Sequence, residues 1–234
     1  MKKRPKGTLI PMGGGVDKEK KKTIMCRLLD ETQRRKPKIC VVTVATIEPD
    51  KEATAYRDCF KSLHKNEFSV VHFTQRSGAN DPKHLEKVRK ADLVILGGGD
   101  QLRLSNLMGG TALMNLLMER YLNDNKFVLA GSSAGATAMS GTMIIAGDGD
   151  RSLIKGELEL TSGLNFTDTV FIDTHFTERG RVGRLIQTVT HNPALLGIGL
   201  GEDTGAIIKA GDKLEVIGSG LMVVVDGHEI SYTN

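Results

Sequence analysis

The segment most informative about the fold is Phe127-Val-Leu-Ala-Gly-Ser-Ser-Ala-Gly135, near the middle of the chain. Its first four residues are apolar and predict a buried strand, and the small residues around Ser133 permit a sharp turn into a helix over residues 134–139. Gly131 to Gly135 match the G-x-S-x-G pattern of a nucleophile elbow, in which such a turn presents a serine hydroxyl. A glycine-rich phosphate loop or a mere packing turn is the alternative interpretation.

Short apolar segments alternate with amphipathic segments on the N-terminal side of this motif. Strands are expected over residues 7–12, 39–45, 68–73, 92–96 and 127–130, and helices over residues 18–35, 52–64, 82–90 and 101–122. Asp81 and Pro82 are typical of a helix start, because Asp caps the N-terminus and Pro fits the first turn. Strands separated by helices indicate an α/β fold, with a mostly parallel sheet covered by helices on both faces.

The part of the chain after residue 140 contains more strand signals. Strands are expected over residues 169–173 and 195–200, a helix over residues 181–190, and a strand-rich meander over residues 205–233. No linker, repeat or low-complexity tract divides this part from the rest. We therefore expect a single α/β domain over residues 1–234, in which residues 1–6 form a basic, flexible tail.

Composition excludes several classes of protein. The 234 residues are 39% hydrophobic and 26% charged, which is typical of a globular domain and not of a disordered chain or a coiled coil. No apolar run reaches about 18 residues, so no membrane span is expected, and the N-terminus lacks the apolar core of a signal peptide. Cys26, Cys40 and Cys59 have no metal-ligand spacing, which favours a reduced, cytoplasmic protein without a metal site.

Positive charge is concentrated at the start of the chain. Residues 1–40 contain 13 lysines and arginines against four acidic residues, a balance that is compatible with nucleic-acid binding. This segment has no interleaved aromatic residues and no binding motif, and much of its charge falls on the helix expected over residues 18–35. We therefore expect a solvated surface and no nucleic-acid partner.

A nucleophilic serine needs a base, and the base needs an orienting acid. Among six histidines, His175 is the best candidate, because it ends an expected strand, and active residues of open parallel sheets lie at the carboxyl ends of strands. Two acids could orient it: Asp173, two residues earlier on the same strand face, and Glu202, which follows the strand expected over residues 195–200. The chain order Ser–His–acid differs from that of α/β-hydrolases and favours another fold.

Two glycine-rich loops follow expected strands, at residues 13–15 and 97–101. Neither matches a nucleotide-binding pattern, so no nucleotide cofactor is expected. In a serine hydrolase, a backbone N–H of Gly99 or Asp100 would join that of Ala134 to form an oxyanion hole.

Four motifs, taken in order, resemble the cyanophycinases, which lie in the serine peptidase family that also includes aspartyl dipeptidase. The motifs are residues 97–101, residues 131–136, Asp173-Thr-His-Phe176 with Arg179, Arg181 and Arg184, and residues 197–204. The similarity extends over about residues 7–228. It implies a class I glutamine-amidotransferase-like α/β fold.

The same resemblance implies roles for individual residues. Ser133 would be the nucleophile, His175 the base and Glu202 the orienting acid. The implied substrate-binding residues are Gln101, Asp173, Thr174, Arg179, Arg181 and Arg184. The implied reaction is exopeptidase cleavage of a poly-aspartate backbone that carries arginine on each β-carboxyl, with β-Asp-Arg dipeptides as products. Arginine side chains would clamp substrate carboxylates, and Asp173 could take a guanidinium group.

Two departures from the family pattern bear on function. Thr174 stands where glutamine is usual, which bears on substrate identity, and Gly201 stands where an acid is usual. Three other functions stay open: a related α-aspartyl or isoaspartyl dipeptidase, a non-catalytic protein that binds a small ligand through the glycine loops, and a metal hydrolase with Asp173, His175 and Glu178 as ligands. We expect no cofactor, a peptide or polymer substrate, and a homodimer as a possible assembly.

Overall fold

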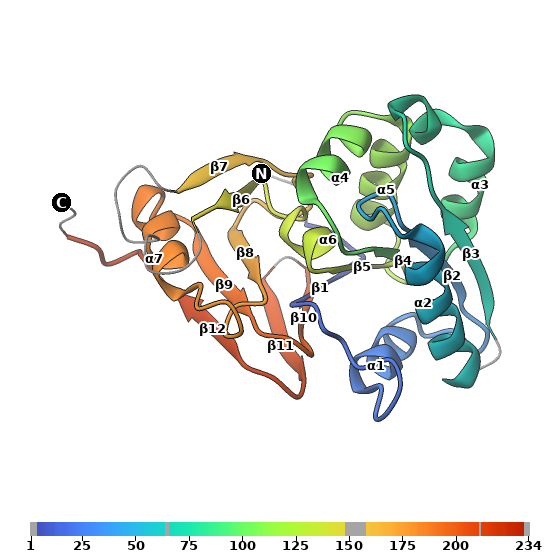
Figure 1. The fold of residues 1–234 in the computed structure, drawn as a ribbon, viewed down its shortest axis with the longest axis horizontal. Coiled ribbons are helices and arrows are strands. Elements are labelled where there is room, and N and C mark those ends of the chain that lie inside the picture. Colours follow the sequence, from blue (N-terminus) through green and yellow to red (C-terminus); the bar gives the residue numbers. More distant parts are fainter. Residues whose placement is uncertain (1–3, 64–65, 148–157, 211, 232–234) are drawn as a thin grey trace.

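A seven-stranded sheet forms the larger half of the computed structural model, which describes residues 4–63, 66–147, 158–210 and 212–231 (Figure 1). The strand order is β11-β10-β1-β5-β4-β2-β3. The five parallel strands are β1 (Thr8–Met12), β2 (Lys38–Val42), β3 (Glu67–Val71), β4 (Leu93–Leu96) and β5 (Val128–Ser132). Strands β10 (Thr204–Lys209) and β11 (Lys213–Gly218) extend the sheet beyond β1 in antiparallel orientation.

Helices cover both faces of this sheet, because side chains along each strand alternate between the two faces. Ile10 and Val41 pack on one face with α1 (Thr23–Glu31) and α2 (Pro49–Leu63). Leu9 and Val42 pack on the other face, which is covered by α3 (Pro82–Lys90), α4 (Gln101–Met108), α5 (Ala112–Asn123) and α6 (Ala134–Thr137). Burial on both faces explains the nearly continuous apolar strands, and the expected fold class is confirmed.

A smaller, three-stranded sheet lies beside the large one, in the order β12 (Met222–Val225), β9 (Leu196–Leu200), β8 (Val170–Thr174). Helix α7 (Val182–His191) packs on it and shares an apolar cluster with Phe176. Gly199 in β9 permits this packing, because a Cβ atom there would lie 2.5 Å from the Phe176 ring. Strands β6 (Thr142–Ala146) and β7 (Glu159–Ser162) form a separate antiparallel pair.

The helix expected over residues 18–35 starts only at Thr23. The carboxylate of Asp17 accepts the backbone N–H groups of the four residues 19–22 and holds them in a loop. The bond from the Lys20 amide is the main reason why the pKa of Asp17 lies well below its usual range. A side chain that satisfies four successive amides offers this segment an alternative to the first helical turn.

The helix expected over residues 101–122 is divided into α4 and α5. The break lies at Gly109-Gly110, where Gly110 has a φ of +67°, and Thr111 then caps α5 by accepting the N–H of Met114. The expected C-terminal meander is also only partly present, because β12 pairs with β9 and not with β11. Residues 211, 232 and 233 of the meander lie outside the described residues, as does His64 at the end of the expected helix 52–64.

The expected flexible tail is only partly described, because residues 1–3 lie outside the described residues. Residue Arg4 forms an ion pair with Asp212 at 3.1 Å, and the amide of Gly7 donates to the Tyr121 carbonyl at 2.8 Å. The described part of the tail therefore contacts the body of the protein.

Candidate active site

The turn between β5 and α6 has the geometry of a nucleophile elbow. Ser133 has a φ of +52°, which is rare for a residue with a side chain and is typical of functional sites. The turn requires glycine on both sides of Ser133. A Cβ atom at Gly131 would lie 2.5 Å from the carbonyl oxygen of Gly135, and one at Gly135 would lie 2.2 Å from that of Leu96. This crowding explains the G-x-S-x-G pattern.

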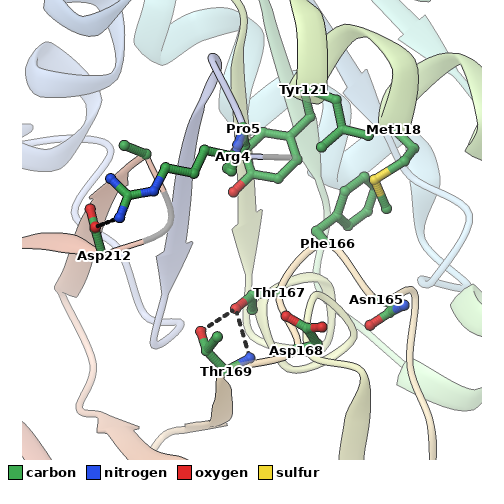
Figure 2. Close-up of a pocket in the computed structure, with 12 residues that line it drawn as sticks. Arg4, Pro5, Met118, Tyr121, Asn165, Phe166, Thr167, Asp168, Thr169 and Asp212 are labelled. Carbon is green, nitrogen blue, oxygen red and sulfur yellow. Dashed lines mark hydrogen bonds and ion pairs between the residues drawn. The ribbon is translucent and has the colours of Figure 1, made fainter. Parts of the chain in front are cut away.

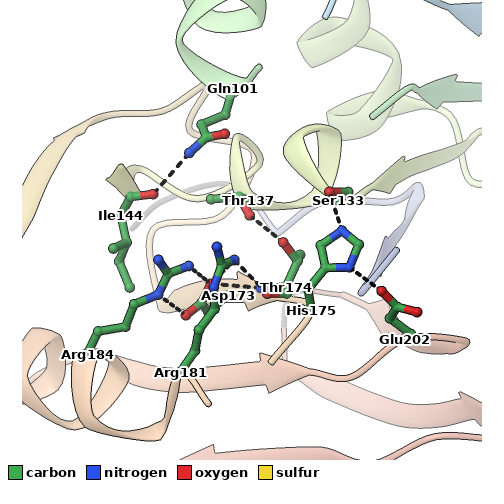
Figure 3. A network of polar contacts seen from close by, with 10 residues as sticks. All are labelled: Gln101, Ser133, Thr137, Ile144, Asp173, Thr174, His175, Arg181, Arg184 and Glu202. Carbon is green, nitrogen blue, oxygen red and sulfur yellow. Dashed lines mark hydrogen bonds and ion pairs between the residues drawn. The ribbon is translucent and has the colours of Figure 1, made fainter. Parts of the chain in front are cut away.

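Ser133, His175 and Glu202 form one continuous hydrogen-bonded chain (Figure 3). The Oγ of Ser133 lies 2.8 Å from His175 Nε2, and His175 Nδ1 lies 2.7 Å from Glu202 Oε1. Because a carboxylate only accepts, His175 Nδ1 is the donor to Glu202, which leaves Nε2 as the acceptor for the serine hydroxyl. The residues come from the carboxyl ends of β5, β8 and β9, so the structure brings together the three residues that the sequence selected.

The first glycine loop, residues 13–15, supports the histidine and its acid. A Cβ atom at Gly14 would lie 2.4 Å from His175 Cε1, and one at Gly15 would lie 2.5 Å from Glu202 Oε2. The Gly13 carbonyl also accepts the backbone N–H of His175 at 2.8 Å. Sequence reasoning treated this loop only as a source of N–H groups for an anion. Its role in this structure is close packing under two functional side chains.

Glu178 positions the backbone of Glu202. Its Oε2 accepts the Glu202 N–H at 3.1 Å, and its Oε1 accepts the Thr177 hydroxyl at 2.8 Å. Burial works to raise the pKa of Glu178, but these hydrogen bonds outweigh it and hold the pKa below its usual value. Within the described residues, no three His, Cys, Asp or Glu side chains are grouped so that they could hold a metal ion. The ligand set Asp173, His175 and Glu178 of the metal-hydrolase alternative is therefore wrong. Asp173 is bound by two arginines, His175 contacts Ser133 and Glu202, and Glu178 accepts from Thr177 and from the Glu202 amide.

Asp173 does not orient His175, although it precedes it by two residues. Its carboxylate is fully buried and pairs with Arg184, whose Nε donates to Oδ2 at 2.6 Å and whose Nη2 donates to Oδ1. Arg181 Nη1 reaches the same carboxylate at 3.4 Å and the Thr174 carbonyl at 2.8 Å. The expectation that Asp173 takes a substrate guanidinium needs correction, because two guanidinium groups of its own chain already occupy it (Figure 3).

The other expected binding residues lie around this cluster. Gln101, at the start of α4, donates from Nε2 to the Ile144 carbonyl at 3.4 Å, and the Thr174 hydroxyl lies 3.3 Å from that of Thr137. Arg179 is exposed in the turn after His175, and its amide donates to the His175 carbonyl at 3.0 Å. The roles of these residues in binding stay predictions.

The expected oxyanion hole requires one correction. The Asp100 amide donates to the Ala45 carbonyl at 3.0 Å, and its carboxylate caps α4, so this residue has no amide hydrogen left for a substrate. Ala134 is the first residue of α6, where an N–H has no intrahelical partner. Sequence reasoning missed Gly98, the loop residue that faces Ser133: a Cβ atom on it would lie 3.7 Å from Ser133 Cβ.

A cavity of about 350 Å³ opens beside Ser133 on the side of α2. Its lining includes Ser133, His175 and Gly98, together with Lys18 and Glu52. A second cavity, of about 530 Å³, lies near the first residues of β1 and β8 (Figure 2). It is thus at the amino ends of these strands, whereas Ser133 and His175 lie at carboxyl ends. None of the expected site residues lines this second cavity.

Sequence comparison identifies the family. The sequence pattern of peptidase family S51 matches residues 9–217. The chain belongs to peptidase family S51. It is therefore a serine peptidase, and the resemblance found in its motifs is confirmed. Cyanophycinase from Synechococcus elongatus is 32% identical over 229 residues, which cover 98% of this chain and 71% of that protein. Cyanophycinase from Geminocystis herdmanii is 32% identical over 234 residues, which cover 100% of this chain and 86% of that protein.

Two solved peptidase structures have a similar fold. A peptidase from an acI-B1 Actinobacterium superposes with a TM-score of 0.74 at 20% identity and covers 97% of this chain and 93% of its own. A putative peptidase E from Listeria monocytogenes superposes with a TM-score of 0.60 at 15% identity, with coverages of 92% and 99%. Both support the glutamine-amidotransferase-like class implied by the motifs. Among the described residues, no helix is both long and apolar enough to span a membrane.

Proposed function

We propose that this S51 peptidase is an exopeptidase that hydrolyses cyanophycin to β-Asp-Arg dipeptides through Ser133, His175 and Glu202. The observation that carries the proposal is the chain of contacts at 2.8 Å and 2.7 Å that joins the three side chains at a strained elbow. The substrate class is supported by the relatives, which are named cyanophycinases and align with this chain almost from end to end. A cytoplasmic location, a single domain and a homodimer stay predictions.

The proposed mechanism follows from the donor and acceptor roles in this chain of contacts. As the Oγ of Ser133 attacks the scissile carbonyl, His175 Nε2 takes its proton, and the Glu202 carboxylate stabilises the imidazolium that forms. The backbone N–H groups of Ala134 and Gly99 would bind the oxyanion of the tetrahedral intermediate. His175 then protonates the leaving amine, and a water molecule, activated by the same imidazole, releases the acyl group from Ser133.

The substrate preference is supported by three arginines that follow His175 in the chain. Each repeat of the polymer carries a carboxylate and a guanidinium group, and Arg179, Arg181 and Arg184 lie on the segment that follows His175. Arg181 and Arg184 are buried against Asp173, so among these three only Arg179 is an exposed cation. We expect Arg179 to contact substrate carboxylates directly, and Arg181 and Arg184 to shape the wall of the pocket.

The decisive experiment combines product analysis with active-site labelling. Purified protein is incubated with insoluble cyanophycin and with a panel of α-aspartyl and β-aspartyl dipeptides, and the products are identified by mass spectrometry. We expect β-Asp-Arg from the polymer and a serine-directed phosphonate adduct on Ser133, with neither in Ser133→Ala. Cleavage confined to α-aspartyl dipeptides would favour the related dipeptidase. Absence of both cleavage and labelling would favour the non-catalytic binding protein.

A further inference from the structure

Two ionisable side chains that the proposed mechanism does not use lie in the cavity beside Ser133. Glu52 comes from α2, and Lys18 comes from the loop before α1. Lys18 Nζ lies 3.4 Å from the Val16 carbonyl and 4.6 Å from the centroid of the Tyr56 ring, and not in ion-pair contact with Glu52. Burial lowers the pKa of the Lys18 ammonium, although the negative charge of Glu52 opposes this effect. Lys18 and Glu52 thus add one charge of each sign to the cavity, beside Glu48 and Lys51, which also line it and form an ion pair with each other.

Glu52 lies against the second glycine loop, close to Ser133: a Cβ atom at Gly98 would lie 3.7 Å from Ser133 Cβ and 3.9 Å from Glu52 Oε1. Its Oε1 accepts the Gly98 N–H at 2.8 Å, and the other carboxylate oxygen is buried without a hydrogen-bond partner among the described residues. Gly97 is required by this contact, because a Cβ atom there would lie 2.4 Å from Glu52 Oε2. Burial raises the pKa of the Glu52 carboxyl, against the effects of the Gly98 amide and the Lys18 charge.

An unpaired buried carboxylate oxygen lowers stability, so its presence in an active-site cavity needs a reason. The other acids near Ser133 are already paired: Asp173 binds two arginines, and the exposed Glu48 forms an ion pair with Lys51 at 3.3 Å. Glu52 is thus the acid of this cavity whose carboxylate retains an unused acceptor oxygen. A cationic ligand would supply the missing donor.

We propose that Glu52 and Lys18 form a subsite for one arginine unit of the substrate, in which Glu52 accepts hydrogen bonds from the guanidinium group and Lys18 binds the α-carboxylate. This inference rests on the proposed function, because it takes the aspartyl-arginine polymer as the ligand. The match is one of charge pattern: the arginine of each repeat has a free carboxylate and a guanidinium group, and the cavity has the complementary pair. A planar guanidinium can also donate two hydrogen bonds to one carboxylate.

Binding is measured first, on the inactive Ser133→Ala variant, so that turnover does not interfere. The probes are the dipeptide β-Asp-Arg and its neutral isostere β-Asp-citrulline, compared by calorimetry. We expect the arginine dipeptide to bind about 10-fold to 100-fold more tightly, the range expected for a hydrogen bond to a charged group. Adding Glu52→Gln should reduce this preference to about 1, because the amide oxygen still accepts the Gly98 N–H but carries no charge.

Glu48→Gln is the matched control for this charge change. It removes a carboxylate that lies just before α2 and lines the same cavity, but one that is exposed and already paired with Lys51. The preference for arginine over citrulline should stay unchanged in this variant. An equal loss of preference in both variants would mean that net charge, and not a subsite at Glu52, sets the preference.

The Lys18 half of the subsite is tested with β-Asp-agmatine, which keeps the guanidinium group and lacks the α-carboxylate. The arginine dipeptide should bind more tightly than the agmatine compound, and Lys18→Met should remove that difference without affecting the arginine-to-citrulline ratio. Lys51→Met, on the rim of the same cavity, should change neither ratio. A Lys18→Met variant that retains the full preference for the carboxylate would overturn this half of the proposal.

Failure of the subsite and failure of the proposed function give different results. Wild-type protein that cleaves cyanophycin, with an arginine-to-citrulline ratio that Glu52→Gln leaves unchanged, would overturn the subsite alone. If Glu52→Gln lowers kcat equally on all substrates, Glu52 only supports the Gly97-Gly98 loop. That result would also overturn the subsite. Protein that binds β-Asp-Arg through Glu52 but cleaves nothing would overturn the proposed function alone. Absence of binding to every probe would overturn both.

Discussion

Asp173 and His175 are separated by one residue, but they belong to two charged clusters with opposite properties. The first cluster, Asp173 with Arg181 and Arg184, is buried, and both arginines contact the Asp173 carboxylate. The second, the chain from Ser133 to Glu202, is partly open to solvent, with 14% of the His175 side chain and 44% of the Glu202 side chain exposed. The first arrangement is complete without a ligand, whereas the second can reach a substrate.

The backbone shows the same difference. Ser133 and His175 both have positive φ angles, +52° and +49°, which cost free energy and are maintained only by surrounding contacts. In the Asp173 cluster, β8 carries Asp173, α7 carries Arg184, and Arg181 is the residue immediately before α7; none of the three has a positive φ. Two members of the proposed catalytic chain thus have a strained backbone, whereas no member of the Asp173 cluster has a positive φ.

The largest expected effect is on the open cluster. Ser133→Ala should lower kcat by about 10⁴-fold or more, because members of such a triad act as a unit. Its free energy of unfolding should be almost unchanged. Ser132→Ala should cost far less activity, because this side chain belongs to the end of β5 and not to the elbow position. Rates on cyanophycin and urea unfolding curves for the two variants test this. An essential Ser132 would show that the elbow has been assigned to the wrong serine.

A paired substitution separates the two clusters directly. Glu202→Gln should lower kcat by about 10²-fold to 10⁴-fold without loss of stability, since the amide supports the imidazolium poorly. Asp173→Asn should instead lower the free energy of unfolding by about 3–5 kcal/mol, because it leaves buried arginines without a countercharge. Parallel kcat and denaturation measurements on both variants are required. If Asp173→Asn costs more kcat than Glu202→Gln while it remains stable, the two acids have been assigned the wrong roles.

Packing under the histidine gives a smaller effect. Gly14→Ala should lower kcat by about 10²-fold, because the new Cβ atom would meet the His175 ring and displace it from Ser133 by a fraction of an ångström or more. The positive φ of Gly14, +96°, adds backbone strain. Gly180→Ala is the matched control, since its φ is also positive, at +60°, but a Cβ atom there meets no atom within 4 Å. Equal losses of kcat in both variants would exclude specific support of His175.

The sequence predicted the open cluster better than the closed one. Ser133 and His175 each follow a recognisable strand, so local patterns and the rule that active residues lie at strand ends selected them. The same rule left Asp173 and Glu202 open as the orienting acid, and the family resemblance favoured Glu202. The partners of Asp173 could not be found in this way, because the positive φ of His175 breaks the alternation of side chains that had placed Asp173 beside it. Glu52 was missed for a similar reason: it contacts Gly98 across the top of the sheet, and nothing within α2 indicates that contact.

The same limit applies to the fold. Alternating strands and helices predicted the parallel sheet and its covered faces, since both depend on local periodicity. The helix expected over residues 18–35 starts late, at Thr23, because one carboxylate, Asp17, accepts four amides before it. The break in the long helix depends on Gly109-Gly110. Asp17 and Gly109-Gly110 are visible in the sequence. Whether such residues stop a helix or are tolerated within it depends on which segments pack against them.

The smallest expected effect concerns stability, and it tests whether Glu52 behaves as a functional group or as a structural one like Asp173. Its carboxyl has an ordinary pKa of 4.5 when unfolded and a raised pKa in the folded protein, so between those two pH values the folded state binds more protons. Stability should therefore decrease as the pH rises through this window, and the loss should persist above it. Glu52→Gln should remove the decrease and give a protein that is slightly more stable than wild type at pH 8 but not at pH 4. Urea midpoints at the two pH values provide the measurement, with Glu48→Gln as the control. A Glu52→Gln variant that is less stable than wild type at pH 8 would show that the ionised carboxylate stabilises the fold, as Asp173 is expected to do. It would contradict the expectation that ionised Glu52 lowers the free energy of unfolding.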